Sequence, residues 1–119
     1  MFKQVIVIRN DIKLKKSETV KIVAWASIFS AQKCKNNFPK KFTQWLKTGQ
    51  KKVVLKTLNL SQLVNLKNNL EKNKKLVFHE VEIPKDFSNK LESREFIAIG
   101  IGPDKEKILD ALTNMYKLL

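Results

Sequence analysis

Four short apolar runs, rich in β-branched residues, constrain the fold of this 119-residue chain more than any other feature. Each run is too short for a helix and has the composition of a buried strand. Between and after the runs, apolar residues recur at the three- and four-residue spacing of helices. We therefore expect strands at residues 4–8, 51–56, 76–83 and 96–101.

Helix boundary residues complete this pattern. Small polar residues, prolines and a glycine stand where helices commonly begin or end. The expected boundary residues are Ser17 and Glu18 for a first helix over 19–33, Pro39 and Gly49 for the second helix, Asn59 or Ser61 for the third, and Pro103 for the last. The order β-α-α-β-α-β-β-α predicts an α/β fold over residues 1–119, one domain with a single-layer, four-stranded mixed sheet and helices on both faces.

The expected first helix is apolar on almost every side, with Val20, Val23, Trp25, Ile28 and Phe29 among its residues. A helix of this kind packs on a sheet and on something else as well. We therefore predict a homodimer in which this helix is covered by a second copy.

Positive charge is concentrated in the first half of the chain, which has a formal net charge of +13 overall. Residues 1–56 hold fourteen Lys or Arg and two acids, whereas residues 57–119 hold ten Lys or Arg and nine acids. Such asymmetry indicates a polyanionic partner, above all a nucleic acid. The alternative is that a lysine- and asparagine-rich composition reflects genomic bias and that the lysines are only solvated.

Other classes of protein are disfavoured. A single cysteine, Cys34, excludes an internal disulfide, and with one histidine, His79, an internal zinc site is not expected. No cofactor is indicated, and we expect both residues to be structural. No run is long enough to cross a bilayer, so the chain is predicted to be cytoplasmic, with no membrane partner.

Three segments resemble the type 2 peptidyl-tRNA hydrolases of archaea and eukaryotes. They are VIVIRNDIKL at 5–14, WLKTGQKKVVLKT at 45–57 and IAIGIGPDKEKILDALTNMYKLL at 97–119. The resemblance implies a homodimer that hydrolyses the ester between a peptide and the 3′ ribose of tRNA. It implies no metal or organic cofactor.

The chain departs from that family's pattern on the first helix. The family has Gly-Lys-Gly-Lys, then a glutamine and a histidine, where this chain has residues 15–18, Ile22 and Trp25. Lys16 retains the first lysine, whereas Glu18 replaces the lysine usually assigned to catalysis. Positions 18, 22 and 25 share one helix face, so a polar face has become largely apolar.

A second departure follows the third expected strand. The family has an Asp-Ala-Gly-Arg-Thr turn, whereas this chain has residues 82–86 and an insertion of about three residues before Arg94. Glu82 or Asp86 is the candidate replacement for the aspartate. The threonine before Gly-Ile-Gly-Pro is Ile97 here. We expect 84–94 to be a mobile loop.

These observations define the candidate residues and leave three functions open. The predicted catalytic residues are Lys16, Glu18 and Asp86, the predicted tRNA-binding residues are Lys13, Lys15, Lys16, Lys21 and Lys56, and no metal ligands are predicted. Trp25 is either a stacking platform for a base or part of a core or dimer interface. The leading hypothesis is a divergent peptidyl-tRNA hydrolase. The alternatives are an inactive relative that binds RNA or a protein, and a dimeric structural domain.

Overall fold

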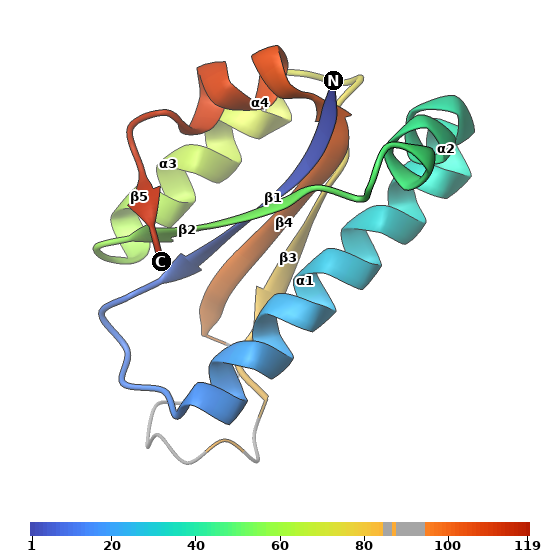
Figure 1. The fold of residues 1–119 in the computed structure, drawn as a ribbon. Helices are drawn as coiled ribbons and strands as arrows, with labels where there is room; N and C mark the ends of the chain where they lie inside the picture. The colour runs from blue at the N-terminus through green and yellow to red at the C-terminus, as the bar shows by residue number, and fades with distance from the viewer. Residues whose placement is uncertain (85–86, 88–94) are drawn as a thin grey trace.

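A computed structural model describes residues 1–84, 87 and 95–119 and contains one five-stranded sheet (Figure 1). The strand order across the sheet is β3-β4-β1-β2-β5. The elements are β1 (Phe2–Arg9), α1 (Lys16–Asn37), α2 (Pro39–Lys47), β2 (Lys52–Thr57), α3 (Leu60–Glu71), β3 (Phe78–Glu82), β4 (Phe96–Lys105), α4 (Glu106–Thr113) and β5 (Lys117–Leu118).

The predicted α/β class and mixed sheet are confirmed, but the predicted number of strands is wrong. β1 and β2 are parallel, whereas β4 is antiparallel to both β1 and β3. The fifth strand, β5, pairs antiparallel with β2 through Leu118 opposite Leu55 and Lys117 opposite Lys56. A two-residue strand has no recognisable pattern of its own, because only the neighbouring strand determines its conformation.

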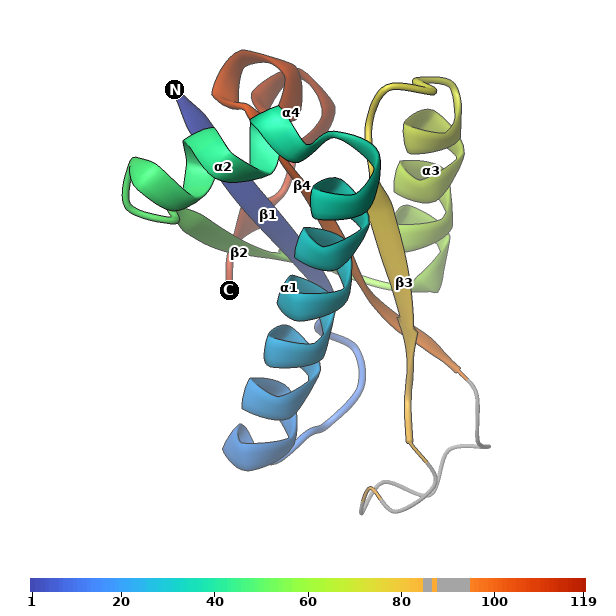
Figure 2. The same cartoon turned by 90° about the vertical axis from the view of Figure 1, so that its right-hand side faces the viewer.

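Helices cover both faces of the sheet, as predicted. α1 crosses one face, and α3 and α4 lie on the other (Figures 1 and 2). Alternate residues of β1 supply the two cores: Val5 and Val7 pack with the leucines of α3, whereas Ile6 and Ile8 pack with Ile22 of α1. This alternation is expected of a strand buried on both faces.

Gly100 allows α1 to approach β4 closely. A Cβ atom placed on Gly100 would overlap the Ala26 carbonyl oxygen, and it would lie 2.8 Å from the Ala26 carbonyl carbon and 3.0 Å from Ser30 Cβ. The side-chain hydroxyl of Ser30 also donates a hydrogen bond to the Gly102 carbonyl oxygen. The glycine therefore determines how deeply the helix lies on the sheet.

Two predicted helix starts are wrong. α1 begins at Lys16, so Ser17 lies inside the helix and Lys15 is its N-cap. The last helix begins at Glu106 because β4 continues through Pro103, where Asp104 and Lys105 pair with Lys3 and Phe2 of β1. Sheet pairing has therefore replaced the helix start that Pro103 suggested.

The starts of the second and third helices agree with the sequence. Pro39 is the first residue of α2, and the Asn59 side chain accepts a hydrogen bond from the Gln62 N–H at the start of α3. The leucines predicted to face inward from α3, Leu63, Leu66 and Leu70, are fully buried. Among the described residues, no helix is both long enough and apolar enough to span a membrane.

Candidate active site

Arg9 joins three segments at the edge of the sheet where β1 ends and β4 begins. Its Nε and Nη2 atoms donate to the two carboxylate oxygens of Asp11, at 3.1 and 2.8 Å. Its Nη1 atom donates to Glu95 at 3.2 Å and to the Phe96 carbonyl oxygen at 3.0 Å. The guanidinium is buried, and its hydrogen bonds to Asp11 hold the pKa of that carboxyl below its ordinary value.

The sequence did not predict a role for the hydrogen bonds of Arg9, although Arg9 and Asp11 both lie in the motif at 5–14. A signal was present, since Arg9 is one of only two arginines in a lysine-rich chain. Arginine forms bidentate pairs with carboxylates that lysine cannot form. Arg9 therefore fixes the turn that leads from β1 toward α1.

The first turn of α1 contains two predicted catalytic residues, Lys16 and Glu18. The Lys15 N–H donates to Glu18 Oε1 at 2.9 Å, which satisfies a backbone donor at the helix start. Glu18 is only 7% exposed, whereas Lys16 is exposed. The helix end thus combines an exposed cation with a buried, hydrogen-bonded carboxylate.

The predicted tRNA-binding lysines lie around this same edge. Lys13, Lys15 and Lys16 are exposed on the segment that enters α1, and Lys21 is exposed within its second turn. Lys56 is half-buried on β2, beside Ile8 of β1. Lys56 also lines a small pocket with Gln62 and Tyr116. None of the other four predicted lysines lines this pocket.

The helix face that follows Glu18 is apolar and buried. Ile22 of α1 and Ile97 of β4 are both 0% exposed and belong to one cluster with Ile6 and Ile8. Trp25 is half-buried, and its ring stacks on Phe87 with centroids 6.1 Å apart. Of the two alternatives for Trp25, this contact supports a packing role.

Comparison with known proteins assigns the chain to a family. The family model described as peptidyl-tRNA hydrolase PTH2 matches residues 2–119. This chain belongs to the PTH2 family. It is 36% identical over 120 residues to a peptidyl-tRNA hydrolase of Methanopyrus kandleri, an alignment that covers 100% of this chain and 99% of that protein.

Other archaeal relatives support the same assignment. The chain is 33% identical to a peptidyl-tRNA hydrolase of Thermococcus onnurineus, over 99% of this chain and 98% of that protein. It is 32% identical to one of Thermoplasma volcanium, over 98% and 97%. The resemblance inferred from three segments therefore extends across the chain and is confirmed.

The resemblance to the PTH2 family concerns two residues of the buried cluster. The resemblance implied that Ile22 and Ile97 stand where the family has a glutamine and a threonine. Both side chains lie in the buried apolar cluster. The third predicted catalytic residue, Asp86, lies outside the described residues, as does most of the 84–94 segment.

Cys34 has the surroundings expected of a structural residue, whereas the Nδ1 atom of His79 is buried with no hydrogen-bond partner among the described residues. Cys34 is buried, and this burial raises the pKa of its thiol to about 11, which disfavours a nucleophilic thiolate. The His79 ring lies 4.9 Å from that of Phe29, and its pKa is lowered, mainly by burial. Within the described part of the chain, no three His, Cys, Asp or Glu residues are grouped to hold a metal ion.

Proposed function

We propose that this chain is a divergent peptidyl-tRNA hydrolase, acting as one domain over residues 1–119. It would cleave the ester between a peptide and the 3′ ribose of tRNA. The observation that carries the proposal is the PTH2 family match over residues 2–119, together with exposed lysines at the start of α1. Because peptidyl-tRNA is formed during translation, we also propose that the protein acts in the cytoplasm.

Binding would begin with the tRNA phosphates. Lys13, Lys15, Lys16 and Lys21 offer four cations near the positive end of α1. Lys56 is proposed as a fifth contact, beside the end of β1. Lysine suits this role because its ammonium is a mobile point charge that can follow a phosphate backbone.

Ester hydrolysis requires a water molecule that loses a proton and donors that stabilise the oxyanion. We propose that Lys16 stabilises the negative charge that develops on the carbonyl oxygen. Glu18 or Asp86 would accept the proton from the attacking water and then donate it to the 3′ oxygen of the ribose as the ester bond breaks.

One observation favours the alternative of an inactive relative that binds RNA without hydrolysing it. The two positions at which the family has polar groups, 22 and 97, are apolar and fully buried. A side chain at either position cannot contact a substrate without movement of the core. The experiment must therefore separate binding from turnover.

The test uses tRNA whose aminoacyl group has been blocked by acetylation, as in diacetyl-lysyl-tRNA. Release of the acylated amino acid and binding of the tRNA are measured on the same protein. We expect turnover that falls about 100- to 1000-fold in Lys16→Ala, the range for loss of one oxyanion donor. The matched control is Lys107→Ala, an exposed lysine of α4 on the opposite face of the sheet.

The outcomes separate the three hypotheses. If the protein binds tRNA in a salt-sensitive way but shows no turnover, the hypothesis of an enzyme is rejected in favour of an inactive relative that binds RNA. No binding at low salt would leave only a structural role. Loss of turnover in Asp86→Ala or Glu18→Gln, with tRNA binding retained, would identify the residue that accepts the proton.

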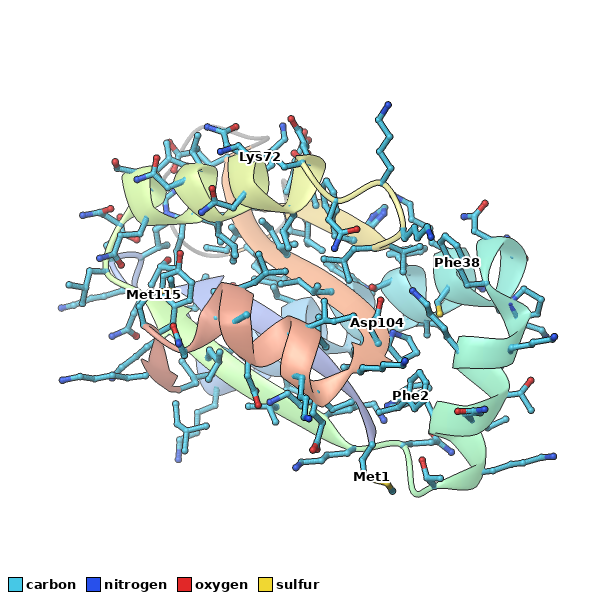
Figure 3. All side chains as sticks on the ribbon, turned by 90° about the horizontal axis from the view of Figure 1, so that it is seen from above. Met1, Phe2, Phe38, Lys72, Asp104 and Met115 are labelled. Carbon is cyan, nitrogen blue, oxygen red and sulfur yellow. The ribbon has the colours of Figure 1, made fainter. Side chains whose placement is uncertain are left out.

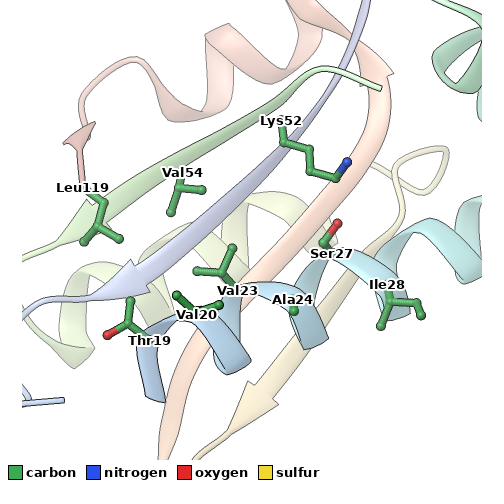
Figure 4. Close-up of a pocket in the computed structure, with 9 residues that line it drawn as sticks. All are labelled: Thr19, Val20, Val23, Ala24, Ser27, Ile28, Lys52, Val54 and Leu119. Carbon is green, nitrogen blue, oxygen red and sulfur yellow. The ribbon is translucent and has the colours of Figure 1, made fainter. Parts of the chain in front are cut away.

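We also propose that the protein is a homodimer. An apolar groove of about 500 Å³ runs between α1 and β2, lined by Val20, Val23, Ile28, Val54 and Leu119 among others (Figure 4). Val20 is 66% exposed and Ile28 is 53% exposed in the single chain. A second copy covering this groove would remove those side chains from water.

Sedimentation equilibrium tests the dimer directly. We expect a dimer for the parent chain and a monomer for Val20→Asp/Ile28→Asp, because charge would then face the partner. Val64→Asp is the matched control, since Val64 is an exposed valine on α3. A stable monomer of the parent chain at micromolar concentration would overturn this part of the proposal.

A further inference from the structure

A second group of lysines lies at the far end of α1 from the candidate active site. There, an open pocket of about 530 Å³ is lined by Lys33, Asn37, Phe38, Lys74 and residues 76–78. We call it the lysine pocket. It lies where the end of α1 meets the connection from α3 to β3 (Figures 1 and 3).

The lysine pocket is held in shape by contacts from three segments. Lys33 Nζ donates to the Phe78 carbonyl oxygen at 3.1 Å, which ties α1 to β3. Lys41 Nζ of α2 donates to the Lys75 carbonyl oxygen at 2.9 Å. The Asn37 amide nitrogen donates to the Lys33 carbonyl oxygen at 2.9 Å. The connection from α3 to β3 is thus fixed against α1 and α2.

The lysines around the lysine pocket are not paired with acidic side chains of the described residues. Lys72, Lys74 and Lys75 are exposed on the connection, and Lys33 and Lys35 are exposed on α1. None of these five forms an ion pair with another residue in the described ranges. Asp104 is 2% exposed and is already paired with Lys41 at 2.8 Å. Lys33 also contributes to the lowered pKa of His79, as uncompensated positive charge would.

The distance between the two lysine groups is set by α1. Lys16 and Lys33 are 17 residues apart on α1, so at 1.5 Å per residue they lie about 25 Å apart along the helix axis. This separation is too large for one terminal nucleotide but suits a folded RNA with phosphates along its length. Repulsion between unpaired lysines favours a ligand that supplies several negative charges.

We propose that the lysine pocket is a second RNA-phosphate site, which binds the backbone of the same tRNA about 25 Å from Lys16. This inference rests on the proposed function for its ligand, and it adds a contact that the five predicted tRNA-binding lysines do not include. Lys33 and Lys74 bind phosphate oxygens inside the pocket. Lys72 and Lys75 extend the contact along its rim.

The test compares two RNAs across a salt series, with affinity measured by fluorescence anisotropy. One is an intact tRNA. The other is a hairpin of four base pairs without a single-stranded 3′ end, whose duplex is at most about 14 Å long at 3.4 Å per pair. This duplex is shorter than the distance between Lys16 and Lys33, so it cannot contact both lysine groups at once.

We expect Lys33→Gln/Lys74→Gln to weaken the binding of intact tRNA and to leave the binding of the hairpin unchanged. The slope of log affinity against log salt should fall by about one unit for each lysine removed. Lys16→Gln should weaken both RNAs. Lys107→Gln is the matched control for removing an exposed charge.

The results that overturn the second site differ from those that overturn the function. If Lys33→Gln/Lys74→Gln binds intact tRNA as the parent does while Lys16→Gln does not, the lysine pocket is not an RNA site. If the double variant weakens the hairpin as much as the tRNA, the two sites are not separate and the inference fails. If neither RNA binds the parent protein, the proposed function fails as well.

Discussion

Ile22 of α1 and Ile97 of β4 lie in the same buried cluster, and neither side chain has any exposed surface. The resemblance to the PTH2 family implied a glutamine and a threonine at these positions. A polar side chain at either position would be enclosed by the apolar residues of this cluster.

Ile22→Gln should destabilise the fold. A buried amide without a partner costs about 1–3 kcal/mol in proteins, so the free energy of unfolding should fall by at least this amount. Urea denaturation followed by circular dichroism measures the change. The control Ile22→Leu keeps the volume and should cost less than about 1.5 kcal/mol. An unchanged urea midpoint in Ile22→Gln would show that the cluster admits water.

Gly100→Ala should also be destabilising, for a steric reason. The added methyl group would overlap the Ala26 carbonyl oxygen, so α1 would have to move away from β4. Overpacking of this kind costs about 1–3 kcal/mol or more. Gly49→Ala is the contrasting variant, because its Cβ would meet nothing within 4 Å and only its positive φ of 104° opposes the change. The two thermal midpoints should rank with Gly100→Ala lower, and the reverse order would refute the close approach.

The Arg9–Asp11 pair should contribute to stability at neutral pH and not in strong acid. Its hydrogen bonds lower the pKa of Asp11 in the folded state, whereas the unfolded carboxyl has a pKa of about 3.9. The contribution is therefore complete above the unfolded value and is lost as pH falls through the folded value. Urea unfolding of Asp11→Asn should differ from the parent at pH 7 and approach it near pH 2. Glu71→Gln, at an exposed acid of α3, should show no such convergence.

His79 should make the fold less stable between pH 7 and pH 5. Burial, and then the charge of Lys33, lower its pKa in the folded state, while Glu80 acts weakly in the opposite direction. The unfolded chain therefore takes up a proton near pH 6.5 that the folded chain resists, so stability falls with pH in this window. His79→Phe should remove this dependence while leaving stability above pH 7.5 little changed. A parent protein with constant stability from pH 7 to pH 5 would contradict the expected cause.

The sequence alone determined the class of fold because period and burial are coupled within each element. Residues 5–8 are apolar without interruption and fully buried, which is typical of a strand covered on both faces. Leu63, Leu66 and Leu70 of α3 recur at helical spacing and all face the core. The concentration of positive charge in residues 1–56 and the motifs of the family could also be read from the sequence alone.

The tertiary structure alone decided three features that depend on contacts between distant segments: the end of β4, the existence of β5 and the lysine pocket. Lys105 was placed in β4 rather than in a helix because it pairs with Phe2, more than a hundred residues away. β5 exists because β2 offers it hydrogen bonds. The lysine pocket is likewise invisible in the sequence, since Lys33 and Lys74 are brought together only when β3 lies beside α1. The spacing of apolar residues in the sequence predicts which face of each element is buried. The pairing of residues far apart in the sequence depends on the geometry of the whole sheet, which this spacing does not contain.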